Sequence, residues 1–281
     1  MKGIKKFLIP KSITELLDVL EQNCEDVLIL GGGTHVELQK KSPKSIIVDI
    51  TKTNLNYIKT DEQYIKIGAT TRVADIINDP LLKKFANGIL VKSACRIGNT
   101  LTKNLVTIGG NLYTSFPWSN FPPALLVLDA KVKLANYENS REIELEYLLK
   151  NNPKKIIQKN ELITEILIPR LPVLLTNYKT FSFTESDFDL AIVATSVIME
   201  NKICKHVKVA IGSALVPCSL IYLMQDLLLN REFNIEVINE AVDKTMADIK
   251  LVKNFRTSPE HLKEVVKTLL RRSFLELSSS T

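Results

Sequence analysis

Thr107-Ile108-Gly109-Gly110-Asn111 is the stretch on which the interpretation of this 281-residue sequence depends. Its two glycines carry no Cβ, so their backbone N–H groups can approach a bound anion closely. We expect these groups to face a pyrophosphate, with Asn111 holding it through a side-chain hydrogen bond. The stretch therefore predicts a phosphate-binding loop, although a glycine pair alone is not specific for one ligand.

A second glycine-rich stretch, Ile29-Leu30-Gly31-Gly32-Gly33-Thr34-His35, follows a short apolar run and precedes a predicted helix over Thr34–Lys40. Backbone N–H groups at such a junction favour phosphate binding. A Rossmann dinucleotide site, with Asp49 on the ribose, would need a glycine where Val36 stands and a longer helix. The pattern therefore disfavours a Rossmann site, and a purely structural turn stays open as an alternative.

The segments around the first glycine stretch predict a small βαβ-like lobe. Ser12 and Glu15 form a capping-box pattern, in which the hydroxyl and the carboxylate each accept from a helix N–H group. The predicted elements are a helix with its apolar stripe at Ile13, Leu16, Leu17 and Leu20, and strands over Val27–Leu30 and Ile46–Ile50.

The rest of the chain predicts a larger mixed lobe and a C-terminal lobe. The mixed lobe has a strand at Tyr64–Ala69, helices at Val73–Asn78, Leu81–Ala86 and Pro122–Asp129, a loop-rich stretch at Gly98–Asn120, a hairpin of Lys131–Ala135 with Arg141–Leu145, and a strand at Leu162–Ile168. Arg170–Thr176 is predicted to connect the lobes. The C-terminal lobe has strands at Tyr178–Phe183, Leu190–Met199 and Cys204–Ile211, then helices at Ser219–Leu229, Ile235–Ile249 and Pro259–Phe274.

Together, in this order and spacing, the two glycine stretches resemble the flavoprotein subunits of the molybdenum hydroxylases, of the xanthine dehydrogenase and carbon monoxide dehydrogenase type. In that family, similar loops clamp FAD between two lobes. The similarity extends to Asn104, to Pro122-Pro123-Ala-Leu-Leu, to the strand Glu161–Pro169, and to Asp189-Leu-Ala and Ile211-Gly212 with Pro217. It covers nearly the whole chain, and the Thr107–Asn111 stretch is its most specific part.

The resemblance implies an α+β fold, with a two-lobed FAD-binding domain over residues 1–170 (lobes of about 1–58 and 59–170) and a C-terminal flavoprotein domain over residues 171–281. It implies non-covalently bound FAD and assigns no catalytic or metal-binding residue to this chain. The expected cofactor-binding residues are Ile29, Leu30, Gly31, Gly32, Gly33, Thr34, His35, Thr107, Ile108, Gly109, Gly110, Asn111, Asn120, Thr164 and Lys179.

Three positions depart from the family pattern. His35 stands where the family usually has an acidic residue, so it is expected to contact FAD through its backbone. Asn120 replaces an aspartate, and its amide can still accept a hydrogen bond, though without charge. Lys179 stands in for a basic stretch that normally precedes the Asp-x-Ala motif, and an exposed strand lysine without a role is an equal alternative.

Composition bounds the partners and the location. Lys and Arg exceed Asp and Glu by 37 to 31, which suits an anionic ligand, but the basic residues are scattered and nucleic-acid binding is not indicated. Cys24, Cys95, Cys204 and Cys218 lie far apart, unlike the thiolates of an iron–sulfur or zinc site. No apolar run is long enough for a membrane span or a signal peptide, so we expect a cytoplasmic protein.

The family role implied is electron transfer, in a complex whose partner subunits carry molybdopterin and 2Fe-2S clusters, with NAD as one candidate acceptor. Two other functions stay open at this stage. One is a stand-alone flavin-dependent NAD(P)H oxidoreductase, and the other is a non-catalytic nucleotide-binding protein with the same fold.

Overall fold

A computed structural model describes residues 4–35, 44–171, 174–185, 187–252 and 256–279. The chain forms two compact units, each built from separate stretches. The first unit takes Met1–Asp79, Ile97–Ser115 and Asp129–Arg170, and the second takes Pro80–Arg96, Phe116–Leu128 and Leu171–Thr281. Among the described helices, none combines the length and the apolar character needed to span a lipid bilayer.

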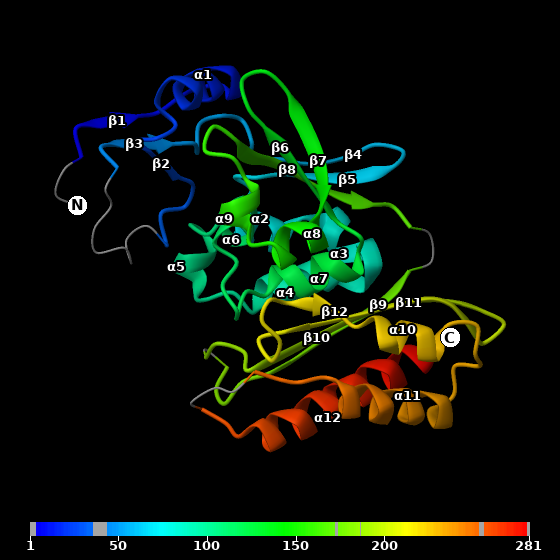
Figure 1. Ribbon diagram of the computed structural model, residues 1–281. Helices are drawn as coiled ribbons and strands as arrows, with labels where there is room; N and C mark the ends of the chain where they lie inside the picture. The colour runs from blue at the N-terminus through cyan, green and yellow to red at the C-terminus, as the bar shows by residue number, and fades with distance from the viewer. Residues whose placement is uncertain (1–3, 36–43, 172–173, 186, 253–255, 280–281) are drawn as a thin grey trace. The chain divides into compact units, whose positions relative to one another are not determined.

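The first unit opens with a three-stranded parallel sheet in the order β1-β3-β2, shown with helix α1 in Figure 1. Its elements are β1 (Lys6–Leu8), α1 (Ile13–Asn23), β2 (Val27–Leu30) and β3 (Ile46–Asp49). Helix α1 begins after Ser12, whose side chain accepts from the N–H group of Glu15 at 3.1 Å. Its fully buried Leu16 and Leu20 join Val48 of β3 in one apolar cluster. The first glycine stretch, Gly31-Gly32-Gly33, therefore directly follows β2 of this packed sheet.

The second sheet of this unit is antiparallel and has the order β4-β5-β8-β6-β7. Val132 and Leu134 of β6 are fully buried while their neighbours are not, as the alternating sequence predicts. The strands are β4 (Ile58–Thr60), β5 (Tyr64–Gly68), β6 (Lys131–Ala135), β7 (Ser140–Glu144) and β8 (Leu162–Pro169), and the helices are α2 (Val73–Asn78), α5 (Thr100–Lys103), α6 (Ile108–Thr114), α8 (Leu145–Lys150) and α9 (Pro153–Ile156).

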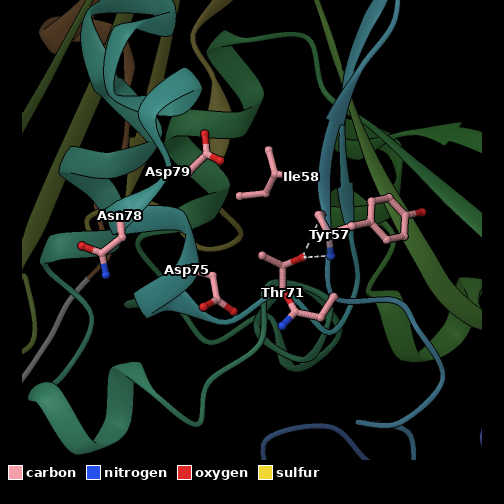
Figure 2. A pocket seen from close by; sticks show the side chains of 7 residues that line it. Tyr57, Ile58, Thr71, Asp75, Asn78 and Asp79 are labelled. Atoms are coloured by element: carbon pink, nitrogen blue, oxygen red, sulfur yellow. Dashed lines mark hydrogen bonds between the residues drawn. The ribbon is translucent and has the colours of Figure 1, made fainter.

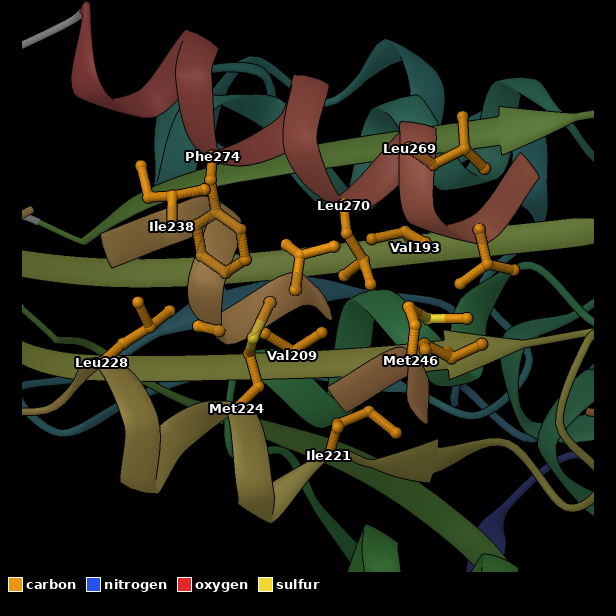
Figure 3. Packing of buried hydrophobic residues seen from close by; sticks show 14 of the residues in the cluster. Val193, Val209, Ile221, Met224, Leu228, Ile238, Met246, Leu269, Leu270 and Phe274 are labelled. Carbon is orange, nitrogen blue, oxygen red and sulfur yellow. The ribbon is translucent and has the colours of Figure 1, made fainter. Parts of the chain in front are cut away.

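The second unit is a four-stranded antiparallel sheet in the order β12-β11-β10-β9, packed with helices. Figure 3 shows Val193 and Val209 of the sheet meeting side chains of the C-terminal helices, such as Met224 and Phe274. The elements are α3 (Pro80–Lys84), the 3₁₀ helix η2 (Phe85–Gly88), α4 (Ile89–Cys95), α7 (Phe121–Val127), β9 (Leu175–Phe181), β10 (Ala191–Glu200), β11 (Ile203–Gly212), β12 (Ser219–Leu220), α10 (Tyr222–Leu228), α11 (Ile235–Asp248) and α12 (Pro259–Ser278).

The α+β class predicted from the sequence is confirmed, as are the predicted hairpin of β6 with β7 and the helix at Val73–Asn78. Several details were wrong. The stretch at Gly98–Asn120 contains α5 and α6, and the predicted helix at Ser219 begins only at Tyr222 because β12 precedes it. Glu15 accepts from the N–H group of Lys11 at 2.7 Å, one residue before the position expected in a capping box.

Two further predictions are neither confirmed nor contradicted by the structure. The predicted helix over Thr34–Lys40 lies outside the described residues from position 36 onward. The domain division at residue 170 stays a prediction, since the second unit also includes Pro80–Arg96 and Phe116–Leu128 from earlier in the chain.

Candidate functional site

The two glycine stretches lie against each other within the first unit. A Cβ atom on Gly32 would lie 1.6 Å from the carbonyl oxygen of Leu105, so only glycine allows the two backbones to approach this closely. A Cβ atom on Gly31 would lie 3.0 Å from Oγ1 of Thr107. The structure thus brings together two segments that lie more than 70 residues apart in the sequence, and their joint binding of FAD stays a prediction.

The Thr107–Asn111 stretch is the start of helix α6, not a loop. Thr107 is the N-cap residue, and its side chain accepts from the N–H group of Gly110 at 3.3 Å. The N–H group of Gly109 donates to the carbonyl oxygen of Ala69 at 2.9 Å, and a Cβ atom on Gly109 would lie 2.7 Å from the Ala69 side chain. The first turn of α6 is therefore fixed by its cap and by close packing, and the N–H groups of Gly109 and Gly110, which were expected to face a pyrophosphate, donate to protein acceptors instead.

Thr164 supports this arrangement from β8. Its carbonyl oxygen accepts from the N–H group of Ala69 at 3.0 Å, and Ala69 in turn accepts from Gly109. The Thr164 hydroxyl donates to the carbonyl oxygen of Lys133 at 3.2 Å, and its side chain is buried. Thr164 therefore holds the segment behind Gly109 in place, and its direct contact with a cofactor stays a prediction.

The polar groups left at this junction fit a dinucleotide. Within the described residues, the backbone N–H groups of Gly31, Gly32 and Gly33 donate to no protein acceptor. Oδ1 of Asn111 is buried and has no hydrogen-bond partner in the described part of the chain. Buried polar atoms are rarely left unpaired in folded proteins, so a ligand is a natural partner. The N–H donors of the glycine stretch and the buried amide oxygen of α6 suit the pyrophosphate and sugar groups of FAD.

The residues that flank the glycines differ in whether their backbone or their side chain is available to a cofactor. Ile29 and Leu30 are half-buried in β2, and the side chain of Ile108 is fully buried, so these three residues are expected to contribute through their backbone. Thr34 and His35 are half-buried. Burial, and then the charge of Lys154, lower the pKa of His35, so its imidazole is uncharged at neutral pH.

Asn120 and Lys179 belong to the second unit, where each has a protein partner. The Tyr178 hydroxyl donates to Oδ1 of Asn120 at 2.7 Å and to its carbonyl oxygen at 3.0 Å. Burial raises the pKa of Tyr178, which keeps this hydroxyl protonated. Nζ of Lys179 pairs with Oε1 of Glu276 at 2.6 Å. The roles of Asn120 and Lys179 toward FAD stay predictions.

Sequence reasoning missed the segment that follows β5. The carbonyl oxygen of Thr71 accepts from the N–H group of Ile108 at 3.0 Å, and Arg72 forms an antiparallel bridge with Thr107. Together with Ala69, these residues hold the start of α6. The signal that could have found them is the run of small and hydroxyl-bearing residues Gly68-Ala69-Thr70-Thr71 directly after a strand.

A hollow of about 320 Å³ lies beside this segment and is drawn in Figure 2. Asp75, Asn78 and Asp79 line it from α2 and its end, opposite Tyr57 and Thr71. Two carboxylates at its wall would repel the phosphate groups of a dinucleotide. This hollow is therefore not part of the candidate FAD site.

Comparison with known families covers nearly the whole chain. Residues 3–171 match the family described as the FAD binding domain in molybdopterin dehydrogenase. Residues 176–277 match the family described as the CO dehydrogenase flavoprotein C-terminal domain. The two matches follow each other in the chain and together include every residue predicted to bind the cofactor.

Individual relatives are similar along their full length. The chain is 28% identical to the glyceraldehyde dehydrogenase medium chain of Sulfolobus acidocaldarius, over 95% of this chain and 96% of the relative. It is 24% identical to the nicotine 6-hydroxylase medium subunit of Paenarthrobacter nicotinovorans, over 98% of both. The fold is similar to that of quinoline 2-oxidoreductase from Pseudomonas putida 86, with a TM-score of 0.90, 19% identity, and coverage of 100% of this chain and 99% of the other.

Proposed function

Because the chain belongs to the FAD-binding subunits of the molybdenum hydroxylase family, we propose that it is the electron outlet of such a complex. In this proposal, electrons reach its FAD from an iron–sulfur partner subunit and leave to NAD⁺ or another acceptor. A molybdopterin partner subunit carries out the hydroxylation. The observation that carries the proposal is the contact of the two glycine stretches in a chain that matches both flavoprotein families.

FAD, when bound, supplies chemistry that links single-electron donors to a two-electron acceptor. The chain's own share is to bind and orient it. In this proposal, the N–H groups of Gly31, Gly32 and Gly33 donate to the pyrophosphate, and Oδ1 of Asn111 accepts from a donor group of the cofactor, because none of these groups has a protein partner within the described residues. Thr107 and Ala69 fix the backbone of α6, so these groups need little rearrangement on binding.

The names of the relatives support the proposal that this chain is one subunit of a complex, but they do not indicate which substrate that complex hydroxylates. Two of them are named as a medium chain and a medium subunit, which supports the proposal that this chain works with partner subunits. Their names give different substrates, glyceraldehyde and nicotine, at similar identity to this chain. We therefore propose no substrate, because substrate recognition is expected on the molybdenum subunit. A cytoplasmic location stays a prediction.

The proposal is tested by assaying the FAD-loaded full-length chain with and without its partner subunits. Alone, it should exchange electrons with a nicotinamide or an artificial dye, followed as bleaching of the flavin absorbance. It should show no activity toward purines, aldehydes or carbon monoxide, and hydroxylase activity should appear only when both partners are added. Flavin reduction by such a substrate without any partner would identify a self-contained oxidoreductase and refute the proposal.

A further inference from the structure

Thr70 carries a buried hydroxyl group that has no hydrogen-bond partner among the described residues. The residue is 3% exposed. A hydroxyl that is removed from water without a partner destabilises the folded state. Its backbone N–H group, in contrast, donates to the carbonyl oxygen of Leu55 at 3.1 Å. The buried side-chain hydroxyl is therefore the donor of this residue that has no partner within the described residues.

The position of Thr70 connects this hydroxyl to the candidate FAD site. Thr70 stands between two residues whose carbonyl oxygens accept from the start of α6: Ala69 accepts from Gly109 at 2.9 Å, and Thr71 accepts from Ile108 at 3.0 Å. The backbone of Thr70 thus runs alongside the most specific motif of the chain. Asn111, in the first turn of the same helix, also carries a buried side-chain atom, Oδ1, without a hydrogen-bond partner among the described residues.

We propose that Thr70 is a further cofactor-contacting residue, whose hydroxyl forms a hydrogen bond with an oxygen of the sugar–phosphate part of FAD. A threonine hydroxyl can donate one hydrogen bond and accept others, so a phosphate oxygen and a sugar hydroxyl are both suitable partners. The inference deepens the FAD site of the proposed function and does not depend on where the electrons come from or go to.

The test compares two variants with the same chemical change in the same unit. Thr70→Val replaces the hydroxyl by a methyl group of similar size, and Thr53→Val is the matched control. Thr53 is 2% exposed, but its hydroxyl donates to the carbonyl oxygen of Ile50 at 2.7 Å. Binding of FAD to the flavin-free full-length chain is measured by quenching of flavin fluorescence, and the melting temperature is measured without FAD.

The two variants should behave in opposite ways. Thr70→Val should weaken FAD binding by about 10-fold, the effect of losing one hydrogen bond, without lowering the melting temperature of the flavin-free chain. Thr53→Val should lower that melting temperature, because a satisfied hydrogen bond is lost, and should leave FAD binding unchanged. Thr70→Ser, which keeps the hydroxyl, should bind FAD nearly as the natural chain does. If Thr70→Val did not fold, Thr70→Ala would test the same loss without filling the space.

Measuring the binding of ADP tests which part of FAD the Thr70 hydroxyl contacts. If Thr70→Val weakens ADP and FAD binding equally, the hydroxyl meets the ADP half, and if only FAD binding weakens, it meets the ribityl side. Unchanged FAD binding in both Thr70→Val and Thr70→Ala would overturn the inference about Thr70. Failure of the natural chain to bind FAD would instead contradict the flavoprotein assignment itself.

Discussion

Replacing Gly32 by alanine should separate the two glycine stretches and remove FAD. The added Cβ atom would stand 1.6 Å from the carbonyl oxygen of Leu105 and 2.5 Å from its carbonyl carbon. Both neighbours are backbone atoms, so no side-chain rotation can relieve the contact. One of the two segments has to move, and the N–H donors of the glycine stretch move with it.

The size of the effect follows from the distances. Ordinary contact begins near 3.4 Å, so the segments must separate by roughly 2 Å. Forcing one methyl group into a packed site typically costs about 1–3 kcal/mol. For a chain of this size, that loss lowers the melting temperature by about 2–4 °C for each kcal/mol. A shift of this size also takes backbone donors out of hydrogen-bond range, so FAD binding should suffer more than folding does.

The assay is the ratio of flavin to protein after purification, together with a melting curve of each variant. Gly31→Ala is the matched control, because its Cβ atom would meet only the Thr107 side chain, with Oγ1 the nearest atom at 3.0 Å. A side chain can give way by a few tenths of an ångström, so this variant should keep most of its flavin. Full flavin content and an unchanged melting temperature in Gly32→Ala would refute the reasoning.

Three further predictions follow from other contacts. Gly110→Val adds a branched side chain, bulkier than the single methyl group of Gly31→Ala, with its Cβ atom 2.9 Å from the capping Oγ1 of Thr107, and this bulk should block the approach of the pyrophosphate; we expect a flavin-poor, less heat-stable protein, which the flavin-to-protein ratio and melting curves would show. Asn120→Asp keeps an acceptor for the Tyr178 hydroxyl and should retain FAD, whereas complete loss of flavin would place this side chain against the pyrophosphate. Burial alone would raise the pKa of Glu161, but hydrogen bonds from Arg141 and from the Gln158 N–H group lower it below 4.5. Its contribution to stability is therefore present above pH 4.5 and lost as the pH falls through the lowered pKa, so Glu161→Gln should make the melting temperature less dependent on pH in that acidic range.

Local sequence patterns were sufficient for most strands and for the long helices. The strand β6 follows from alternation, and α12 from its apolar stripe, because one buried face leaves a direct mark on the sequence. Helix α6 was missed for a physical reason. Two glycines in its first turn have low helix propensity, and the helix is stabilised there by the Thr107 cap and by packing of Gly109 on Ala69. Such tertiary support leaves no local periodicity.

Of the candidate site, the sequence alone was sufficient to find the glycine stretches but not the residues that contact them. Both glycine stretches were recognised because together, in their order and spacing, they resemble a known family, although each alone is a weak signal. Their partners were not recognised, because the contacts of Leu105 and the hydrogen bond accepted by Ala69 use backbone atoms, and such contacts place little demand on residue type. Thr70 was overlooked as well, since a single buried hydroxyl is noticed only when its missing partner is visible in three dimensions.

In the proposed site the glycine stretches serve both packing and FAD binding, and substitutions can separate the two roles. Gly32 and Gly109 are required where they stand because a neighbouring backbone or side chain occupies the space of a Cβ atom. Gly33 has a different reason, since its positive φ of 75° is a conformation that other residues rarely adopt, while the nearest atom to an added Cβ is a side-chain carbon of Leu30 at 3.4 Å. Substitutions at Gly32 and Gly109 act first on the contact between segments, whereas one at Gly33 acts first on the direction of its own N–H group. Only the second kind can impair binding of FAD while leaving the contact between the two stretches intact.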